Sequence, residues 1–181
     1  MNIMPLETDP AIRRRRSRRL KGYDYSQAGA YFITICTHNH ECMFGHISDG
    51  EMVLNDAGRI VHAVWDGLTE RFPGLELDTL TVMPNHVHGI VIFVGALLAA
   101  PSTQGRASPA PTLGDVMRAF KSISAIRINR MMRRTGSLWQ RNYYEHVIRG
   151  EDDLNDIRQY ILDNPTRWAD DENNPERMIH P

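Results

Sequence analysis

The run of β-branched and aromatic residues at 86–93 constrains the fold of this chain most. Val, Ile and Phe dominate this run, as is typical of a core strand. A second apolar run, at 77–83, precedes it, and Pro84-Asn85 between the two is typical of a tight turn. Strands joined by so short a connection are antiparallel neighbours. The sequence therefore predicts an antiparallel strand pair in the core sheet.

Two histidines lie at the start of the second of these strands. Alternate residues of a strand point to the same face, so His86 and His88 would present two imidazoles side by side. Such a pair offers two nitrogen ligands to a metal ion. Two histidines at this spacing are equally compatible with packed or solvated strand residues, because such pairs are common.

Length and composition indicate one domain outside a membrane. With 181 residues, of which 41% are hydrophobic, the chain can bury one core. The longest apolar run, 89–100, is too short to span a bilayer, and the N-terminus lacks the pattern of a secretory signal. Two cysteines make no disulfide framework, and the spacing Cys36-x-His38-x-His40-x-Cys42 differs from that of common structural zinc sites. We expect a cytoplasmic protein.

Charge is distributed unevenly along the chain, although the formal net charge is only −1. One basic cluster lies in the first 22 residues, a second lies between 113 and 149, and acidic residues are concentrated after 150. Basic clusters of this kind neutralise phosphates, so the pattern favours a nucleic-acid partner. The alternative is a solvated arm and an ordinary charged helix face. The residues that we expect to contact DNA are Arg13, Arg14, Arg15, Arg16, Arg18, Arg19, Lys121, Arg127 and Arg149.

The remaining elements follow from apolar periodicity and from capping and turn residues. They are a strand at 30–37, a hairpin at 44–54 with Asp49-Gly50 in its turn, a helix from Asn55 or Asp56 to Pro73, a helix from Thr112 with Asp115 in its capping box, a last strand or extended segment at 138–149, and a helix from 151 to 164.

This order predicts an α+β fold, a ferredoxin-like (RRM-like) sandwich with an antiparallel four-stranded core sheet and helices on one face. We expect the histidine pair on the other, open face, against an additional C-terminal helix. Residues 1–22 should form a basic flexible arm, 95–111 a flexible internal loop, and 169–181 a loose acidic tail.

The last helix carries the second half of the expected site. Tyr160 and Asn164 are four residues apart, and hence on one side of that helix. A phenol with a pKa of about 10 is a poor nucleophile unless its target is polarised. A cation on His86 and His88 could polarise a phosphate, and Asn164 could add an oxygen ligand. The alternative for Tyr160 is a packed aromatic residue.

Three separated motifs resemble those of the HUH nucleases, and within them the single-tyrosine transposases of the REP-associated group. They are Met-Pro-Asn-His-Val-His at 83–88, Trp-Gln-Arg at 139–141 followed by Glu-His-Val-Ile-Arg at 145–149, and the segment from Tyr160 to Pro165. The likeness covers residues 23–168, which would form the transposase domain. It implies the same ferredoxin-like fold and a metal-dependent enzyme that cuts and rejoins single-stranded or hairpin DNA.

Carried over to this chain, the resemblance implies that Tyr160 attacks the scissile phosphate and holds the 5′ phosphate covalently. It also implies that His86 and His88 bind a divalent metal, Mg or Mn, with Asn164 at the position of a third polar ligand. Whether the chain is a monomer or a homodimer stays open. Two other functions stay open as well: a non-catalytic single-stranded nucleic-acid-binding domain of the same topology, and a hydrolase that uses a metal-bound water.

Overall fold

The computed structural model describes residues 28–94 and 111–179. The expected basic arm at 1–22, with Arg13, Arg14, Arg15, Arg16, Arg18 and Arg19, therefore lies outside the described residues. The same holds for all but the last residue of the expected internal loop at 95–111.

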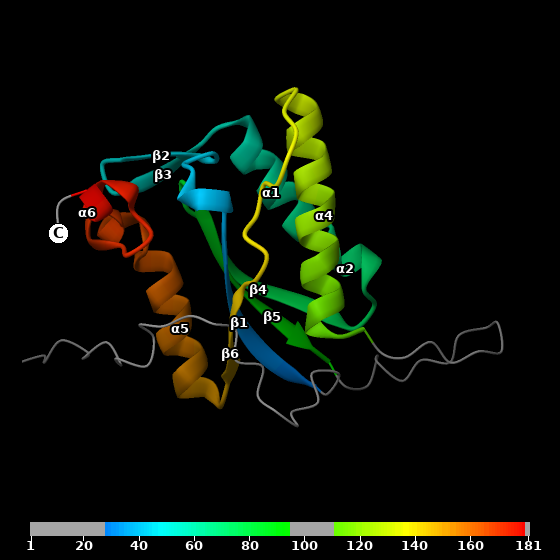
Figure 1. Ribbon diagram of the computed structural model, residues 1–181. Coiled ribbons are helices and arrows are strands. Elements are labelled where there is room, and N and C mark those ends of the chain that lie inside the picture. The colour runs from blue at the N-terminus through cyan, green and yellow to red at the C-terminus, as the bar shows by residue number, and fades with distance from the viewer. Residues whose placement is uncertain (1–27, 95–110, 180–181) are drawn as a thin grey trace, which may run out of the picture.

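Four strands form one antiparallel sheet in the order β4-β5-β1-β6 (Figure 1). Their bounds are β1 (Gly29–Cys36), β4 (Leu75–Val82), β5 (His86–Phe93) and β6 (Tyr144–Ile148). Helix α1 (Asp56–Asp66) lies in the connection from β1 to β4, and helix α4 (Leu113–Met131) in that from β5 to β6. This is the βαββαβ order of a ferredoxin-like fold, so the predicted fold class is confirmed.

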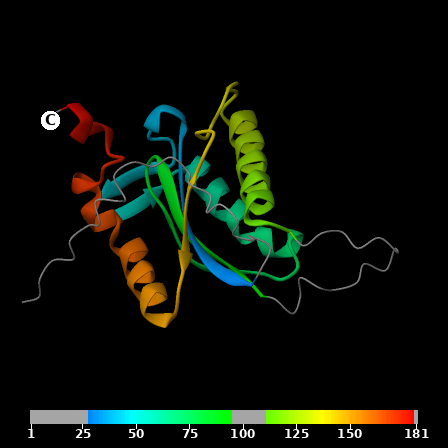
Figure 2. The ribbon, with the colours of Figure 1, turned by 60° about the horizontal axis from the view of Figure 1, so that its bottom comes forward.

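Helices cover both faces of the sheet (Figures 1 and 2). On one face, Tyr31, Ile33 and Ile35 of β1 belong to the main core with residues of α1 and α4. On the other face, Phe32 and Ile90 pack with Ile161 of α5 (Glu151–Asp163). Because the period of a strand is two, the histidines of β5 lie on the α5 face, as expected. The C-terminal helix thus covers the face that the two crossover helices leave free.

Helix starts follow the predicted capping residues. The Asn55 side chain accepts a hydrogen bond from the backbone N–H of Gly58 at the start of α1. Thr112 and Asp115 form a complete capping box at the start of α4. Each cap satisfies backbone N–H groups that have no partner inside the helix, which is why these two boundaries were readable from sequence.

Several elements differ from the expected ones or add to them. The helix expected from 55 to 73 is broken at Gly67 into two helices. In the segment expected as a last strand or extended segment at 138–149, only β6 is a strand, and Trp139 before it forms an isolated bridge with Thr37. No helix among the described residues is both long and apolar enough to cross a bilayer. The other elements are η2 (His38–His40), β2 (Gly45–Ser48), β3 (Glu51–Leu54), α2 (Leu68–Arg71), η3 (Pro165–Asp170) and α6 (Pro175–Ile179).

The packing of α1 on the sheet depends on a missing side chain in β5. A Cβ on Gly89 would lie 2.6 Å from Cη2 of Trp65, whose indole is buried. We therefore expect Gly89→Ala to lower the free energy of unfolding by about 1–3 kcal/mol through overpacking, as measured by urea denaturation. Gly67→Ala is the control, because its Cβ would meet no atom closer than 3.5 Å. An equal loss in both variants would contradict the steric explanation.

Candidate active site

The two histidines of β5 lie side by side on the α5 face of the sheet, as the strand spacing predicts. Both are fully buried, and their Nε2 atoms are 3.0 Å apart. The Nδ1 atom of His88 lies 2.9 Å from the hydroxyl of Thr34, on the neighbouring strand β1. The ring of Phe32 stacks on that of His88. Nδ1 of His86 lies 2.8 Å from the side-chain oxygen of Asn85. A group on the far side of each ring thus holds its Nε2 atom toward the other histidine.

Tyr160 comes from α5 to the same place. Its ring centroid is 5.5 Å from that of His88, and it packs edge to face on Phe32 at 5.9 Å. The residue is 40% exposed, so solvent or a ligand can reach it. A phenol from the C-terminal part of one chain therefore lies beside two imidazoles from the middle of the same chain. The expected juxtaposition of Tyr160 with the histidine strand is present within a single subunit.

Asn164, one helical turn after Tyr160, is also buried in this region. Its amide nitrogen donates a hydrogen bond to the carbonyl oxygen of Tyr160, at 2.7 Å. This bond leaves the amide oxygen as the atom that could bind a cation. The assignment of Asn164 as a third ligand stays a prediction.

A carboxylate that the sequence analysis did not select lies beside the histidines. Asp171 Oδ2 is 3.6 Å from His86 Nε2, and one donor atom from each of His86, His88 and Asp171 can be chosen so that all three lie within 4.8 Å of one another. The Asp171 side chain is only 7% exposed. Two imidazole nitrogens and one carboxylate oxygen are a donor set that suits a hard or borderline divalent cation. The residues present are therefore compatible with a divalent metal ion.

The expectation of a loose acidic tail from residue 169 is wrong for the part of the tail that contains Asp171. Asn173 and Asn174 are buried, and the backbone oxygen of Asn173 accepts a hydrogen bond from Asn85. The ring of Trp168 lies 6.1 Å from that of His86. Composition alone made this segment look solvated, because three of the four residues from 169 to 172 are acidic.

A bidentate ion pair fixes the helix that carries Tyr160. Arg158 of α5 donates to both carboxylate oxygens of Asp78 on β4, at 2.9 and 2.6 Å. Asp78 lies where the β4–β5 register shifts between Leu77 and Leu80, and such bulges re-aim side chains. The hydrogen bonds from Arg158, with those from Thr79, lower the pKa of the Asp78 carboxyl to about 2.

The stability that this pair contributes should depend on pH. The pKa of Asp78 is about 2 in the folded chain, whereas an aspartate in an unfolded chain has a pKa of about 3.9. The pair therefore stabilises the fold fully above about pH 4, and this stabilisation is lost as pH falls from about 4 through about 2. We expect Asp78→Asn to lower the free energy of unfolding near neutral pH by about 1–2 kcal/mol. The difference from wild type should shrink as pH falls from about 4 to about 2, as followed by urea denaturation.

The control for this variant is Asp66→Asn, which removes an exposed pair with His62. It should change stability by less than about 0.5 kcal/mol. A deficit of Asp78→Asn that stayed constant over the acid range would contradict the ion-pair explanation.

The structure separates the three described cations that were expected to contact DNA. Arg127 is exposed on α4, which lies across the sheet from α5 (Figure 2). Lys121 donates to the backbone oxygens of Gln140 and Arg141, at 2.6 and 2.8 Å, and burial lowers the pKa of its ammonium group. Arg149 is exposed at the end of β6, directly before α5. Lys121 therefore holds the segment before β6, and Arg149 is the nearest of the three in sequence to the tyrosine helix.

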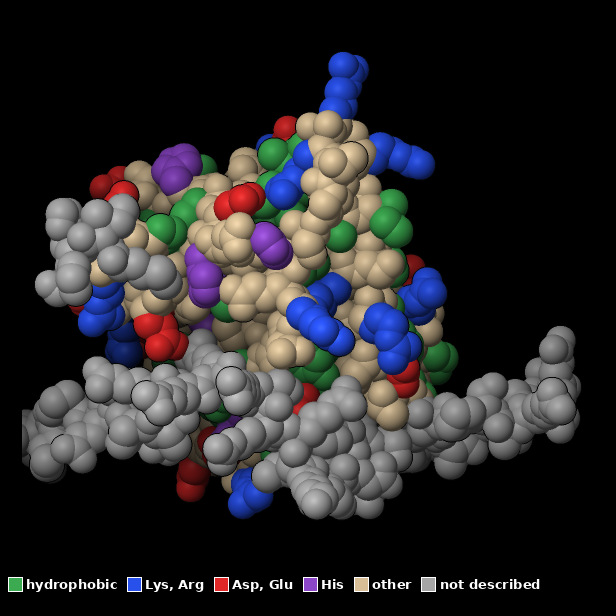
Figure 3. Space-filling model, viewed as in Figure 1, with side chains coloured by type: hydrophobic (Ala, Val, Ile, Leu, Met, Phe, Trp, Pro, Cys, Tyr) green, Lys and Arg blue, Asp and Glu red, His purple; other side chains and the backbone are tan. Residues whose placement is uncertain are grey.

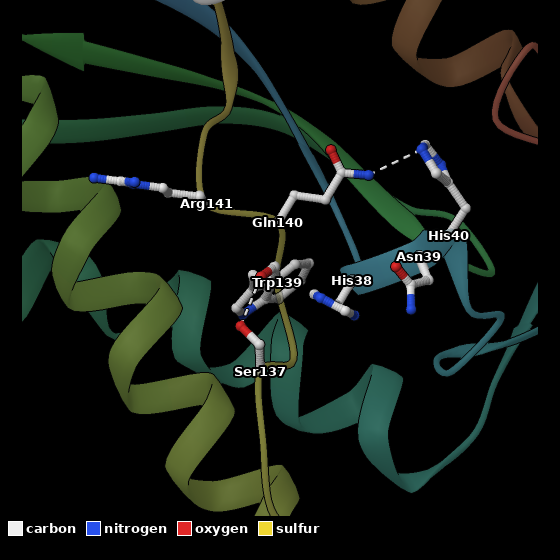
Figure 4. Close-up of a pocket in the computed structure, with 7 residues that line it drawn as sticks. All are labelled: His38, Asn39, His40, Ser137, Trp139, Gln140 and Arg141. Atoms are coloured by element: carbon white, nitrogen blue, oxygen red, sulfur yellow. Dashed lines mark hydrogen bonds between the residues drawn. The ribbon is translucent and has the colours of Figure 1, made fainter.

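A hollow of about 610 Å³ lies between η2 and the segment that Lys121 holds (Figure 4). Gln140 points toward His40, and its amide nitrogen lies 2.9 Å from Nε2 of that ring. In the space-filling view, histidine and basic side chains are exposed around this part of the molecule (Figure 3). The residues that line the hollow are His38, Asn39, His40, Ser137, Trp139, Gln140 and Arg141.

Comparison with known proteins gives sequence relatives over most of the chain. No family model matches it. An uncharacterized protein of Haemophilus influenzae is 39% identical over 177 residues, which cover 93% of this chain and 98% of that protein. A second Haemophilus influenzae protein, described as "Putative REP-associated tyrosine transposase", is 24% identical over 149 residues, 80% of this chain and 74% of that protein.

The fold is shared by a solved structure described as a REP-associated tyrosine transposase bound to a REP hairpin, with a TM-score of 0.54 and 19% sequence identity to this chain. The match covers 80% of this chain and 71% of the other. At this identity the likeness establishes the fold alone. Together with the relative that is described as a transposase, it supports the resemblance to the REP-associated group that the three motifs indicate.

Proposed function

We propose that this chain, which resembles the REP-associated tyrosine transposases in sequence and in fold, is a metal-dependent enzyme that cuts and rejoins single-stranded DNA next to a hairpin. One observation carries the proposal: Tyr160 of α5 lies beside the two histidines of β5, on one face of the sheet and within one chain. The motifs around both residues are those of the group. The hairpin bound to the structural relative supports the substrate class.

Tyr160 is the nucleophile in this proposal. Its phenol oxygen forms a bond to the scissile phosphorus while the bond from phosphorus to the 3′ oxygen breaks. The phenol loses its proton, and the departing 3′ oxygen gains one. The 5′ phosphate stays on Tyr160, so the energy of the phosphodiester is kept for the reverse reaction with another 3′ hydroxyl. Strand transfer therefore needs no nucleotide cofactor.

His86, His88 and Asp171 would hold the divalent metal, and a bound metal would supply stabilisation of the charge that develops on the phosphate. Imidazole nitrogens and carboxylate or amide oxygens suit Mg or Mn. Burial of the histidines excludes water from their side of the site. Tyr160 is 40% exposed, so a DNA strand can reach it.

DNA contacts outside the site are assigned to Arg149 and to the basic residues at the start of the sequence. Arg149 is exposed beside the N-terminus of α5, and the arm residues Arg13 to Arg19 carry the densest positive charge of the sequence. Such residues contact the phosphate backbone and position the strand without reading its sequence.

The non-catalytic binding domain is less well supported. RNA-recognition modules of this topology bind through an open sheet face. Here α5 covers that face, and its Ile161 is buried against Phe32 and Ile90. Beside it Tyr160 is exposed while the histidine pair is buried, which fits chemistry at the tyrosine better than a flat binding platform.

A single incubation tests the proposal. The full chain is mixed with a labelled DNA that contains a hairpin and a single-stranded flank, with and without Mg. We expect a covalent protein–DNA complex and a released strand with a free 3′ hydroxyl, both dependent on Mg. Binding without any cleaved strand would favour the non-catalytic domain instead.

The third ligand can be identified by substitution. We expect Asp171→Asn to weaken Mn binding about 10-fold or more, because a charged oxygen is lost from the donor set. Calorimetric titration of Mn measures this directly. Asn164→Ala is the comparison: a larger loss there would assign the third position to Asn164.

A further inference from the structure

We infer that Asn85 is a positioning residue for the proposed metal site: its side-chain amide sets which nitrogen of His86 faces the site and holds the segment of Asp171 beside it. The inference rests on the proposed function and deepens it. Asn85 stands in the turn between β4 and β5 and is fully buried.

The orientation of the Asn85 amide follows from its partners. Its nitrogen donates to the backbone oxygens of His40, at 3.0 Å, and Asn173, at 2.7 Å. Carbonyl oxygens only accept, so the reverse orientation would place an oxygen against two oxygens. The amide oxygen therefore points the other way, and it lies 2.8 Å from Nδ1 of His86.

This contact determines the tautomer of His86. An amide oxygen only accepts, so Nδ1 of His86 must carry the proton. In the neutral ring the lone pair is then on Nε2, the atom that lies 3.0 Å from Nε2 of His88 and 3.6 Å from Asp171. An imidazole binds a cation through its unprotonated nitrogen. In the other tautomer, the proton of Nε2 would occupy the place of the metal.

The bond to Asn173 connects the same amide to the carboxylate. The backbone N–H and the side-chain amide of Asn173 both donate to Oδ1 of Asp171, at 2.6 and 3.0 Å. Oδ2 is left toward His86. Asn85 thus ties the beginning of β5 to a segment 88 residues later, and Cys36 at the end of β1 adds a weaker hydrogen bond to Asn173 Oδ1 at 3.6 Å.

The third partner, His40, belongs to the tight turn η2. Asn39 and His40 both have left-handed backbone angles, with φ of 54° and 56°. The side chain of His40 is held in turn by Gln140 (Figure 4). One buried amide therefore joins three segments that are far apart in sequence, and all three meet next to the histidine pair.

The test uses the full chain labelled with ¹⁵N-histidine, without metal, at a pH where the rings are neutral. Long-range ¹H–¹⁵N spectra report which ring nitrogen of His86 carries the proton. We expect the Nδ1–H form in the wild type and a shift toward Nε2–H in Asn85→Ala. A titration with Mn alone should show binding about 10- to 100-fold weaker in Asn85→Ala than in the wild type.

Asn55→Ala is the matched control. Its amide caps α1 and contacts no residue of the site, so the variant loses a helix cap but should keep both the tautomer and the Mn affinity. Asn85→Asp is the second variant, because a carboxylate still accepts from Nδ1 of His86 and should preserve the Nδ1–H form, while it can no longer donate to the backbone oxygens of His40 and Asn173. If neither variant folds, the wild-type spectrum alone still tests the inference, because an Nε2–H form of His86 there overturns it.

The inference is overturned if His86 keeps the Nδ1–H form in Asn85→Ala, if Asn85→Asp loses that form, or if Mn binds Asn85→Ala within twofold of the wild type. If the wild type binds no Mn, the metal in the proposed function is contradicted. The role of Asn85 is then tested by the tautomer measurement alone.

Discussion

Replacing Tyr160 with phenylalanine should abolish the covalent protein–DNA complex and slow strand cleavage by at least about 10³-fold, the scale of loss when a nucleophile is removed. Only the hydroxyl is lost. The ring keeps its edge-to-face contact with Phe32 and its position beside His88. We therefore expect the free energy of unfolding to change by less than about 0.5 kcal/mol, as for other exposed sites. The measurement is a single-turnover cleavage assay with Mg.

Tyr144→Phe is the matched control for this experiment. Tyr144 also packs edge to face on Phe32, from β6 rather than α5, and it should keep full cleavage. The same assay separates the proposal from hydrolysis by a metal-bound water. Cleavage that persists in Tyr160→Phe, without a covalent complex, would show that water is the nucleophile.

Removal of either histidine should have the second-largest effect. We expect His86→Ala and His88→Ala to slow Mg-dependent cleavage by about 10²- to 10⁴-fold, because one nitrogen donor and several kcal/mol of charge stabilisation are lost. Binding of Mn should weaken in parallel, and a calorimetric titration measures it without any DNA. His86→Gln is a second variant that keeps a polar side chain of similar volume at this buried position.

His62→Ala is the matched control for the histidine variants. His62 is exposed on α1, across the sheet from the site, and pairs with Asp66. It should leave both cleavage and Mn binding unchanged. If His86→Ala and His88→Ala lost cleavage but bound Mn as tightly as the wild type, the histidines would act on DNA or on Tyr160 and not through a metal.

Much of the fold could be predicted because local signals and the hydrophobic pattern agree. The caps at Asn55 and Thr112 and the Asp49-Gly50 turn act within a few residues, so their effect can be read from the sequence. The alternation along β5 fixes which face the histidines occupy. These local features were confirmed. The long helix breaks at Gly67, the C-cap of α1, and this glycine is a local stop signal that the prediction did not use.

The site was predicted in its strand and helix parts but not in its loop parts. His86 and Tyr160 lie on regular elements, so spacing and motif placed them. Asp171 and Asn173 lie in a turn whose position depends on a long-range hydrogen bond to Asn85. Nothing in the local sequence distinguishes such a turn from a solvated acidic segment. Likewise, the pairing of Asp78 with Arg158 joins residues 80 positions apart and has no local signal.

The most direct measurement of the central claim is the identity of the residue that carries the DNA. The covalent complex formed with hairpin DNA is isolated, digested with nuclease and trypsin, and sequenced by mass spectrometry. Cleavage after Arg158 and Arg167 yields a peptide in which Tyr160 is the sole tyrosine. We predict a 5′-phosphonucleotide on that tyrosine. The same mass on any other residue would contradict the account.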